Sequence, residues 1–518
     1  MNEPTPTTAN VTTTDVLIIG AGPTGLTLAC ELARRGVSFL LLERSTTPST
    51  ASRAKTIQPR TMEVADDLGV AGRILTEGRV NVPTRRYDHD QVISEAVEVA
   101  IGAHTTDAPY PPVWLSQPRF EQILRARLTE LGGTIHWGSE VTDLQQDDDG
   151  VTATIETTAA GPDAGGHTVH ARYAVGADGG RSTVRALADI ELHGTSLTDQ
   201  RWHLGDVRVT GLSRHCQHLW TSKEDGLLSL FPLPGTDLWQ FQASIPTDLA
   251  QPEEPSLELF RCIFAERAGI PGVVIKDVAW LSLYRINVLL ADHYRNRRIL
   301  LAGDAAHIHS PAGGQGMNTG IQDAYNLGWK LAALLGGADP ALLDTYEHER
   351  RTVARNVLDD STTRLRNLMR ATAENHGPSV QQGLTDDRTT GLGIVYADSP
   401  LTHGPGAGVR APDAPCRNAA TGHPTRLFDL LRGPQWTLLS FGNTTVQQTP
   451  HGPRTYRVTT DPTATGPDTV IDTDDLAHHA YQVTGDELVL IRPDGYIAAR
   501  RPAHDLPAVL ALAATNGL

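Results

Sequence analysis

The sequence predicts an α/β protein in which an antiparallel sheet is inserted into a domain with parallel strands. Three observations predict this class. Residues 15–44 alternate strand, glycine turn, helix and strand, residues of about 190–290 form strand-like segments between Pro and Gly turns, and residues 297–307 return to the first pattern. At 518 residues the chain is too long for one compact core, so we expect two or three domains.

The N-terminal pattern has the features of a βαβ unit. The apolar run DVLIIG predicts a buried strand, and Leu28, Ala29, Leu32 and Ala33 recur at helical spacing before Gly36 ends the helix. VSFLLLER then predicts a second buried strand. Parallel strands that are buried on both faces and joined by a helix indicate a Rossmann-like domain.

The turn between the first strand and the helix has the spacing GxGxxG. It consists of Gly20, Gly22 and Gly25, with Pro23 and Thr24 before the last glycine. The first glycine permits a tight turn, the second lets the backbone approach a pyrophosphate, and the third allows close packing of helix on strand. The N–H groups at the helix N-terminus then face the phosphates.

An acidic residue follows at the expected distance. Glu43 ends the second strand, 18 positions after Gly25, where a carboxylate can bond ribose hydroxyls. A GxGxxG motif alone is a weak signal, but strand, helix and acid in this order predict a dinucleotide site. The motif does not separate FAD from NAD.

Bulk composition narrows the function classes. The formal net charge of -16 argues against binding nucleic acid or an anionic membrane, since both carry phosphate charge of the same sign. Cys30, Cys216, Cys262 and Cys416 are scattered without a CxxC pair, which indicates neither a disulfide framework nor a zinc site. The N-terminus lacks a signal-peptide pattern and the apolar runs are too short for a membrane span, so we expect a cytoplasmic protein.

Two later segments favour FAD. Residues 175–182 read VGADGGRS and residues 301–307 read LAGDAAH. With the first glycine motif they resemble the DG and GD fingerprints of class A flavoprotein monooxygenases, whose model member is para-hydroxybenzoate hydroxylase. The resemblance covers nearly the whole chain and is closest to the aromatic polyketide hydroxylases of actinomycetes.

The resemblance implies roles for particular residues in FAD binding. Asp304, which follows Gly303, is expected to bond the ribityl chain, and Arg53 is expected near the flavin phosphates and the mobile ring. Gln117 resembles the FAD-binding glutamine of the family. Arg44 is expected near the adenosine end of the cofactor.

A second glycine turn is expected beside the flavin ring. The run of residues 311–318 is expected to pass along the isoalloxazine and to start a helix, and it contains Pro311, Gly314, Gly316, Met317 and Asn318. A helix N-terminus at this place stabilises the negative charge of reduced flavin.

Several neighbouring residues have two interpretations. In the family the Asp178 segment is associated with both FAD and NAD(P)H binding, whereas DG is also an ordinary turn signal. Arg181 and Arg185 either pair with cofactor phosphate or are solvated charges. His307 and His309 form an HxH pair, but no third ligand of suitable spacing is evident, so no metal site is predicted.

The resemblance also implies the domain organisation. Residues 1–190 and 291–400 are expected to form a Rossmann-like FAD-binding domain with connecting helices, and residues 190–290 a substrate-binding antiparallel β-sheet domain. Residues 405–518 resemble a thioredoxin-like C-terminal domain, which lacks a CxxC dithiol and is therefore expected to have a structural or interface role. The aromatic and polar residues of the sheet are either core or substrate contacts: Trp202, His203, Trp220, Phe231, Trp239, Phe241 and Tyr284.

The function that the resemblance implies is hydroxylation of an aromatic polyketide or another polycyclic phenol with O2. NADPH or NADH is expected to reduce FAD, which takes up O2 as a C4a-hydroperoxide whose distal oxygen is attacked by an electron-rich ring carbon. Baeyer–Villiger oxygenation, antibiotic inactivation and a flavin-binding redox sensor are the alternatives. The residues identify no catalytic base, and a homodimer is implied by the resemblance alone.

Overall fold

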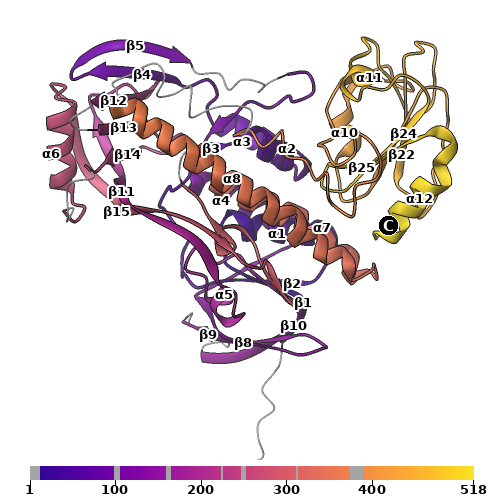
Figure 1. The fold of residues 1–518 in the computed structure, drawn as a ribbon, viewed down its shortest axis with the longest axis horizontal. Coiled ribbons are helices and arrows are strands. Elements are labelled where there is room, and N and C mark those ends of the chain that lie inside the picture. The colour runs from indigo at the N-terminus through magenta and orange to yellow at the C-terminus, as the bar shows by residue number, and fades with distance from the viewer. Residues whose placement is uncertain are drawn as a thin grey trace, which may run out of the picture.

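The computed structural model contains three large sheets, arranged from one end of the molecule to the other (Figure 1). It describes residues 12–97, 105–158, 165–222, 226–246, 253–310, 313–373 and 389–517. The central sheet and the helices against it hold the N-terminal motif. The second sheet lies on one side of this centre, and the C-terminal module lies on the other.

The central sheet has the parallel core that the sequence predicts. Its path is β16-β17-β10-β1-β2-β7, and an antiparallel extension of β8 and β9 joins β10. The pairs β1–β10, β1–β2, β2–β7 and β10–β17 are parallel. The strands are β1 (Thr12–Ile19), β2 (Phe39–Glu43), β7 (Ile135–Trp137), β8 (Ser139–Gln146), β9 (Val151–Thr157), β10 (Gly165–Gly176), β16 (Arg295–Asn296) and β17 (Ile299–Leu301).

The register of this sheet brings the three fingerprint segments together. Ile19 pairs with Gly176, and Gly176 pairs with Leu301. Because parallel strands end at the same edge of a sheet, the glycine and acidic residues that follow each strand lie side by side. Segments separated by more than a hundred residues in the sequence therefore form one surface.

Helices cover the central sheet and extend beyond it. The helix α1 packs against both α4 and α7, and α7 packs against α8. Figure 1 shows α8 as a long orange helix that continues to the second sheet, where it contacts β12, β13 and β15. The helices are α1 (Pro23–Arg34), α2 (Pro59–Asp67), α3 (Ala71–Glu77), α4 (Gln117–Glu130), α5 (Thr183–Leu187), α7 (Gly316–Leu335) and α8 (Ala341–Ala373), with a short η1 (Gly303–Ala305).

The second sheet is mainly antiparallel, as the sequence predicts. Its order is β18-β15-β11-β14-β13-β12-β4-β5, and only the β12–β4 pair among its described strands is parallel. One face packs on α6 (Leu257–Arg267) through an aromatic core. The strands are β4 (Pro83–Asp88), β5 (Gln91–Val97), β11 (Leu192–Thr210), β12 (Gln217–Ser222), β13 (Gly226–Pro232), β14 (Trp239–Ser244), β15 (Val274–Ala291) and β18 (His307–Ile308).

Three strands of this sheet come from outside the predicted insert. At one end of the sheet lies β18, and at the other end lie β4 and β5, for which the sequence pattern predicts no strand. A separate two-stranded sheet pairs β3 (Thr56–Ile57) with β6 (Val113–Trp114). The domain limits drawn from the sequence stay a prediction.

The C-terminal module is a mixed sheet flanked by short helices. Its order is β20-β19-β23-β22-β21-β24-β25, with parallel pairs between β21, β22 and β23. The elements are β19 (Pro415–Asn418), β20 (Pro424–Arg426), α10 (Leu427–Leu431), β21 (Thr437–Phe441), β22 (Arg454–Thr459), β23 (Thr469–Ile471), α11 (Leu476–Ala480), β24 (Glu487–Ile491), β25 (Ile497–Pro502), η2 (Ala503–Asp505) and α12 (Leu506–Thr515).

A buried ionic network joins this module to α7 and α8. The guanidinium of Arg492 donates to both carboxylate oxygens of Glu349, at 2.6 and 2.9 Å, and also contacts Asp494 at 2.6 Å. Lys330 Nζ lies 2.7 Å from Glu349 Oε2. All four side chains are buried, so each charge depends on its partners for compensation.

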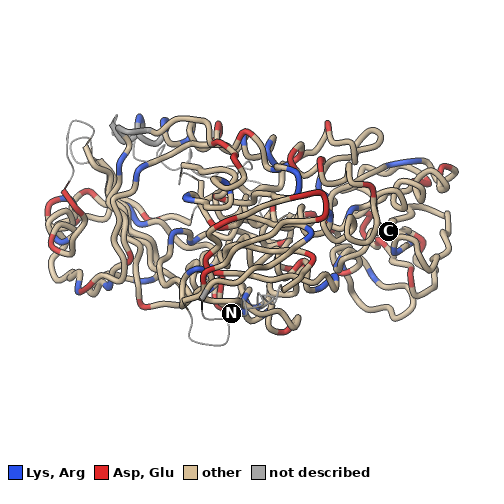
Figure 2. Tube along the Cα trace, turned by 90° about the horizontal axis from the view of Figure 1, so that it is seen from below, with Lys and Arg blue, Asp and Glu red and all other residues tan. Residues whose placement is uncertain are grey.

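Charges elsewhere are dispersed. Figure 2 shows Lys and Arg interspersed with Asp and Glu along the chain. Among the described residues, no helix is both long and apolar enough to cross a membrane.

Candidate active site

A cavity of about 2050 Å³ lies between the central sheet and the second sheet. Its lining combines the carboxyl ends of β1, β2 and β10 with side chains from β11, β12, β13 and β15. Ligand pockets usually have volumes of about 300–1,000 Å³. The cavity is therefore large enough for a dinucleotide together with a second organic molecule.

The three glycines of the first motif occupy different surroundings. Gly20 has φ +104°, and a Cβ there would lie 2.4 Å from the carbonyl oxygen of Ala177. A Cβ on Gly25 would lie 1.9 Å from the carbonyl oxygen of Gly20, whereas one on Gly22 would meet no protein atom within 4 Å. Gly20 and Gly25 thus serve the packing of the turn, and Gly22 borders open cavity space, as do Pro23 and Thr24.

The acid at the end of β2 supports the same turn. Glu43 lines the cavity, and its Oε2 accepts a hydrogen bond of 2.9 Å from the N–H of Ala21. Its Oε1 accepts a bond of the same length from the N–H of Ser45. Arg44 is exposed and also lines the cavity.

Asp178 is engaged within the protein although it lines the cavity. Its carboxylate accepts a hydrogen bond from Ser182 Oγ at 2.5 Å and another from the N–H of Val184 at 3.1 Å. These bonds hold the start of α5, which favours the turn interpretation for the carboxylate itself. Arg185 donates to the carbonyl oxygens of Gly180 and Ala305, both at 3.0 Å.

Asp304 faces the cavity from the third fingerprint. Its side chain is exposed to the cavity, where desolvation by the surrounding protein raises the pKa of the carboxyl, and His307 and Arg53 act in the opposite direction. Arg53 lines the same cavity. Gly303 is not among the residues that line the cavity. A Cβ at Gly303 would lie only 2.6 Å from Thr24 Oγ1. Gly303 thus permits close packing on α1.

The second glycine turn leads into α7 at the cavity wall. Gly314, Gly316 and Met317 line the cavity, while Pro311 lies outside the described residues. Asn318 is buried and is not among the described residues that line this cavity. Its side chain accepts from the N–H of Gln58 at 2.9 Å and donates to the carbonyl oxygens of Thr56 at 2.9 Å and Gly314 at 2.7 Å, which fixes the turn on β3.

Gln117 connects the cavity wall to α4. It lines the cavity, and its Oε1 accepts from the N–H of Ala54 at 3.1 Å. Its Nε2 donates to Glu121 Oε1 at 2.9 Å. Gln117 thus holds the segment that carries Arg53.

The second sheet divides its aromatic residues between two faces. Trp202, Phe231 and Tyr284 line the cavity. Trp220, Trp239 and Phe241 pack with α6 in the aromatic core, and His203 stacks edge-on against Phe260 in the same region. The alternation of side chains along strands explains this division.

Sequence reasoning did not find Lys55, which lines the cavity beside the second sheet. Its Nζ donates to Gln240 Oε1 at 2.8 Å and lies 3.7 Å from the centroid of the Phe231 ring. One signal in the sequence pointed to it. Four of the 44 basic residues other than histidine are lysines, and one of these four lies two positions after Arg53, which the family resemblance places near the flavin.

Comparisons with known proteins identify the family. The family model described as an FAD binding domain matches residues 13–361, and the model for the C-terminal part of aromatic-ring hydroxylases matches residues 404–516. The chain belongs to the FAD-dependent aromatic-ring hydroxylases. FAD is the cofactor of this family.

Relatives of this hydroxylase are similar over nearly the full chain. A flavin-dependent monooxygenase of Mycobacteroides abscessus is 41% identical over 93% of this chain and 96% of that protein. A 6-methylpretetramide 4-monooxygenase of Streptomyces rimosus is 36% identical over 94% and 90%. The solved ternary complex of aklavinone-11 hydroxylase with FAD and aklavinone has a TM-score of 0.76 and 26% identity, and covers 97% of this chain and 99% of that one.

The HxH pair of this hydroxylase forms a buried hydrogen-bonded chain. His307 Nε2 lies 2.6 Å from Asp323 Oδ2, and His307 Nδ1 lies 2.7 Å from His309 Nε2. Asp323 also accepts from Arg350 Nε at 2.7 Å. Both ring nitrogens of His307 are therefore engaged by protein atoms.

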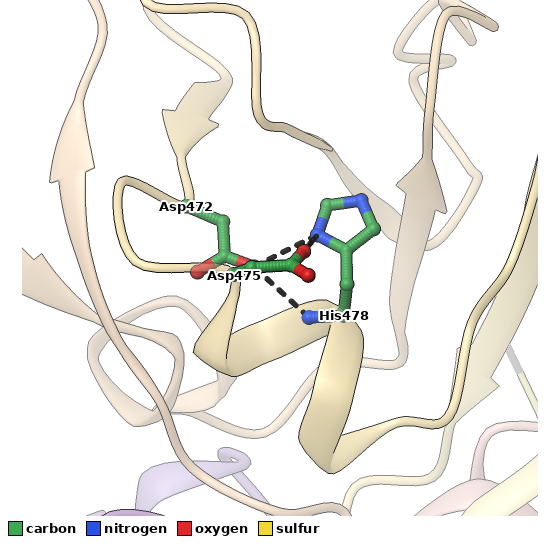
Figure 3. Close-up of side chains that lie close together, drawn as sticks. All are labelled: Asp472, Asp475 and His478. Carbon is green, nitrogen blue, oxygen red and sulfur yellow. Dashed lines mark hydrogen bonds and ion pairs between the residues drawn. The ribbon is translucent and has the colours of Figure 1, made fainter.

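Among the described residues, one cluster brings three potential metal ligands within 4.8 Å of one another, and Figure 3 shows its members, Asp472, Asp475 and His478. It lies in the C-terminal module. Asp472 Oδ2 contacts both the backbone N–H of His478 at 2.9 Å and its Nδ1 at 2.8 Å. These contacts hold the first turn of α11, so the cluster has a structural explanation.

Proposed function

We propose that this hydroxylase uses FAD, NAD(P)H and O2 to place one oxygen atom on an aromatic polyketide or another polycyclic phenol. The observation that carries the proposal is the large cavity between the two sheets, which has a glycine-rich wall suited to a dinucleotide and an aromatic wall on the second sheet. The similarity to 6-methylpretetramide 4-monooxygenase supports this substrate class.

We propose that the predicted site residues hold FAD along the first wall. Gly22 and the N-terminus of α1 would receive the pyrophosphate, since a Cβ at Gly22 would fill space that the protein leaves open. Glu43 would hold the ribose, and Asp304 with Arg53 would hold the ribityl and phosphate region. The N-terminus of α7, which starts at Gly316, would stabilise negative charge on the reduced ring.

The need for NAD(P)H follows from the electron balance of monooxygenation. One atom of O2 enters the product and the other leaves as water, which requires two electrons beyond those of the substrate. Bound FAD would supply the chemistry that passes these electrons from NAD(P)H to O2. The protein would orient the substrate ring and exclude water, for which Trp202, Phe231 and Tyr284 are suitably placed.

The test measures NAD(P)H consumption by the purified, FAD-loaded protein across a panel of polycyclic phenols. We expect NAD(P)H consumption that a suitable phenol stimulates, and one labelled oxygen atom per product when the gas is ¹⁸O2. Nuclear magnetic resonance of the product should show a new ring hydroxyl. An ester or lactone instead would indicate Baeyer–Villiger oxygenation, and FAD binding without stimulated turnover would indicate a sensor.

The cytoplasmic location and the homodimer are further proposals. They rest on the sequence pattern and on the family resemblance, respectively. Sedimentation of the FAD-loaded protein tests the homodimer.

A further inference from the structure

Lys55 projects from the segment next to the cofactor wall to the face of the second sheet. Its Nζ donates to Gln240 Oε1 on β14 and lies above the Phe231 ring on β13. These two contacts use two directions around a tetrahedral nitrogen. The side chain also borders the cavity, so the amine can meet a molecule bound there.

The partner of this amine is held in a fixed orientation. Gln240 Nε2 donates to the carbonyl oxygen of Ser52 at 2.5 Å, so its Oε1 must face Lys55. Gln242 Nε2 donates to the same Oε1 at 2.8 Å. Gln240 Oε1 therefore accepts hydrogen bonds from two donors, Lys55 and Gln242.

The backbone around Lys55 is anchored on three sides. The carbonyl oxygen of Lys55 accepts from the N–H of Leu115 at 2.9 Å. The preceding residue, Ala54, donates to Gln117, and the following residue, Thr56, accepts from Asn318. Gln117 and Asn318 also hold the cavity wall that is proposed to bind FAD. The backbone that carries Lys55 therefore has a defined position relative to that wall.

The surroundings of Lys55 bring the pKa of its amine close to neutral pH. Burial lowers the pKa of the amine to about 7, while Asp206 on β11 acts to raise it. Burial also raises the pKa of Asp206 to about 6, against the effects of the Ser52 N–H and of Lys55. The contacts from β13 and β14 are uncharged, and Arg53 is the other basic residue on the same segment.

We infer that Lys55 is a catalytic residue that takes the proton from a phenolic hydroxyl of the bound substrate and holds the resulting phenolate. The phenol O–H bond breaks and a new N–H bond forms, which gives an ammonium paired with a phenolate. The phenolate ring carbons beside and opposite the oxygen become more electron-rich, as oxygen transfer to the ring requires. The proton returns to the phenolic oxygen when the product leaves. This inference rests on the proposed function.

A first experiment measures the amine without substrate. The four lysines of the FAD-loaded protein are dimethylated with ¹³C-formaldehyde, and their methyl signals are followed by NMR as the pH changes. Lys55→Arg assigns the signal of Lys55. We expect the signal of Lys55 to titrate near neutral pH. A titration midpoint of Lys55 near the ordinary lysine value of 10.5 would overturn the inference.

A second experiment measures the bound phenol without turnover. A phenol that the panel shows to be hydroxylated is added to oxidised enzyme without NAD(P)H, and its phenolate absorption is followed against pH. We expect Lys55→Met to raise the apparent pKa of the bound phenol by at least one unit and to lower kcat at pH 7 at least tenfold. Lys55→Arg should restore the phenolate band at pH 7 but shift the acid limb of the kcat/KM profile.

The control is Lys276→Met, which removes an exposed lysine of β15 outside the cavity lining and should match the wild type in every readout. If the wild type hydroxylates a phenol and Lys55→Met has the same phenolate band and pH profile, the role of Lys55 is refuted while the proposed function stands. If the wild type hydroxylates no phenol, the proposed function fails, and the NMR titration still reports on Lys55.

Discussion

Adding one methyl group at either of two glycines should separate the space that the protein leaves for FAD from the space that it needs for its own packing. In Gly22→Ala the new Cβ meets no protein atom within 4 Å, and the backbone φ of −74° suits alanine. In Gly25→Ala it would lie 1.9 Å from a backbone oxygen, where ordinary contact begins at 3.4 Å. The turn and α1 must therefore separate by about 1.5 Å.

The expected magnitudes follow from these contacts. Overpacking against other atoms costs about 1–3 kcal/mol, and we expect Gly25→Ala at the upper end because the obstacle is backbone. For Gly22→Ala, the loss of a favourable helix N-cap residue opposes the reduced entropy of the unfolded chain, and each effect is about 0.4–1 kcal/mol. The apoprotein should thus change by less than about 0.5 kcal/mol, while FAD affinity falls at least about tenfold, or 1.4 kcal/mol.

Urea unfolding of the apoprotein measures the first quantity, and quenching of flavin fluorescence measures the second. Gly72→Ala is the control, since a Cβ there also meets no protein atom within 4 Å but Gly72 does not line the cavity. It should leave FAD affinity unchanged. The reasoning is refuted if Gly25→Ala unfolds like the wild type, or if Gly22→Ala binds FAD with undiminished affinity.

Three further results are expected. Arg492→Met should destabilise the protein by about 3–5 kcal/mol in urea unfolding because it leaves Glu349 buried with less compensation, whereas Arg208→Met at an exposed ion pair should leave the unfolding midpoint nearly unchanged. Cys416→Ala should leave NAD(P)H oxidation and product yield within about twofold, since Cys416 has no CxxC partner to exchange electrons with. Lys55 has a pKa of about 7 in the folded protein against 10.5 ordinarily, so unfolding takes up a proton between these values. The stability of the wild type relative to Lys55→Met should therefore rise from pH 7 to pH 10 in urea unfolding and stay level below pH 7.

The sequence predicted the parts of the fold that depend on local patterns. The strand and helix around Gly20–Gly25 and the strand that ends at Glu43 lie where their apolar periodicity placed them. Leu28, Ala29 and Leu32 are fully buried, as their helical spacing predicted. The family resemblance added the order of the domains, which apolar patterns do not contain.

Long-range pairing limited the rest. Nothing local in residues 83–97 indicates that β4 would pair in parallel with β12, because the partner lies more than a hundred positions away. The cofactor contact of Asn318 stays a prediction, and the sequence did not reveal that its side chain bonds to Gln58, Thr56 and Gly314. The electrostatic surroundings and the hydrogen bond of Lys55 come from Asp206 and Gln240, and the sequence does not show that these residues lie beside it.

The buried ionic network that joins the C-terminal module to α7 and α8 limits how domains can be exchanged between related enzymes. Arg492 and Asp494 come from the module, whereas Lys330 comes from α7, which begins at the cavity, and Glu349 comes from α8, which contacts the second sheet. A C-terminal module from a relative with different charged residues at these positions would leave a buried acidic or basic side chain without its partner. Chimaeras should therefore inherit all four residues as a set, or replace all four by apolar ones.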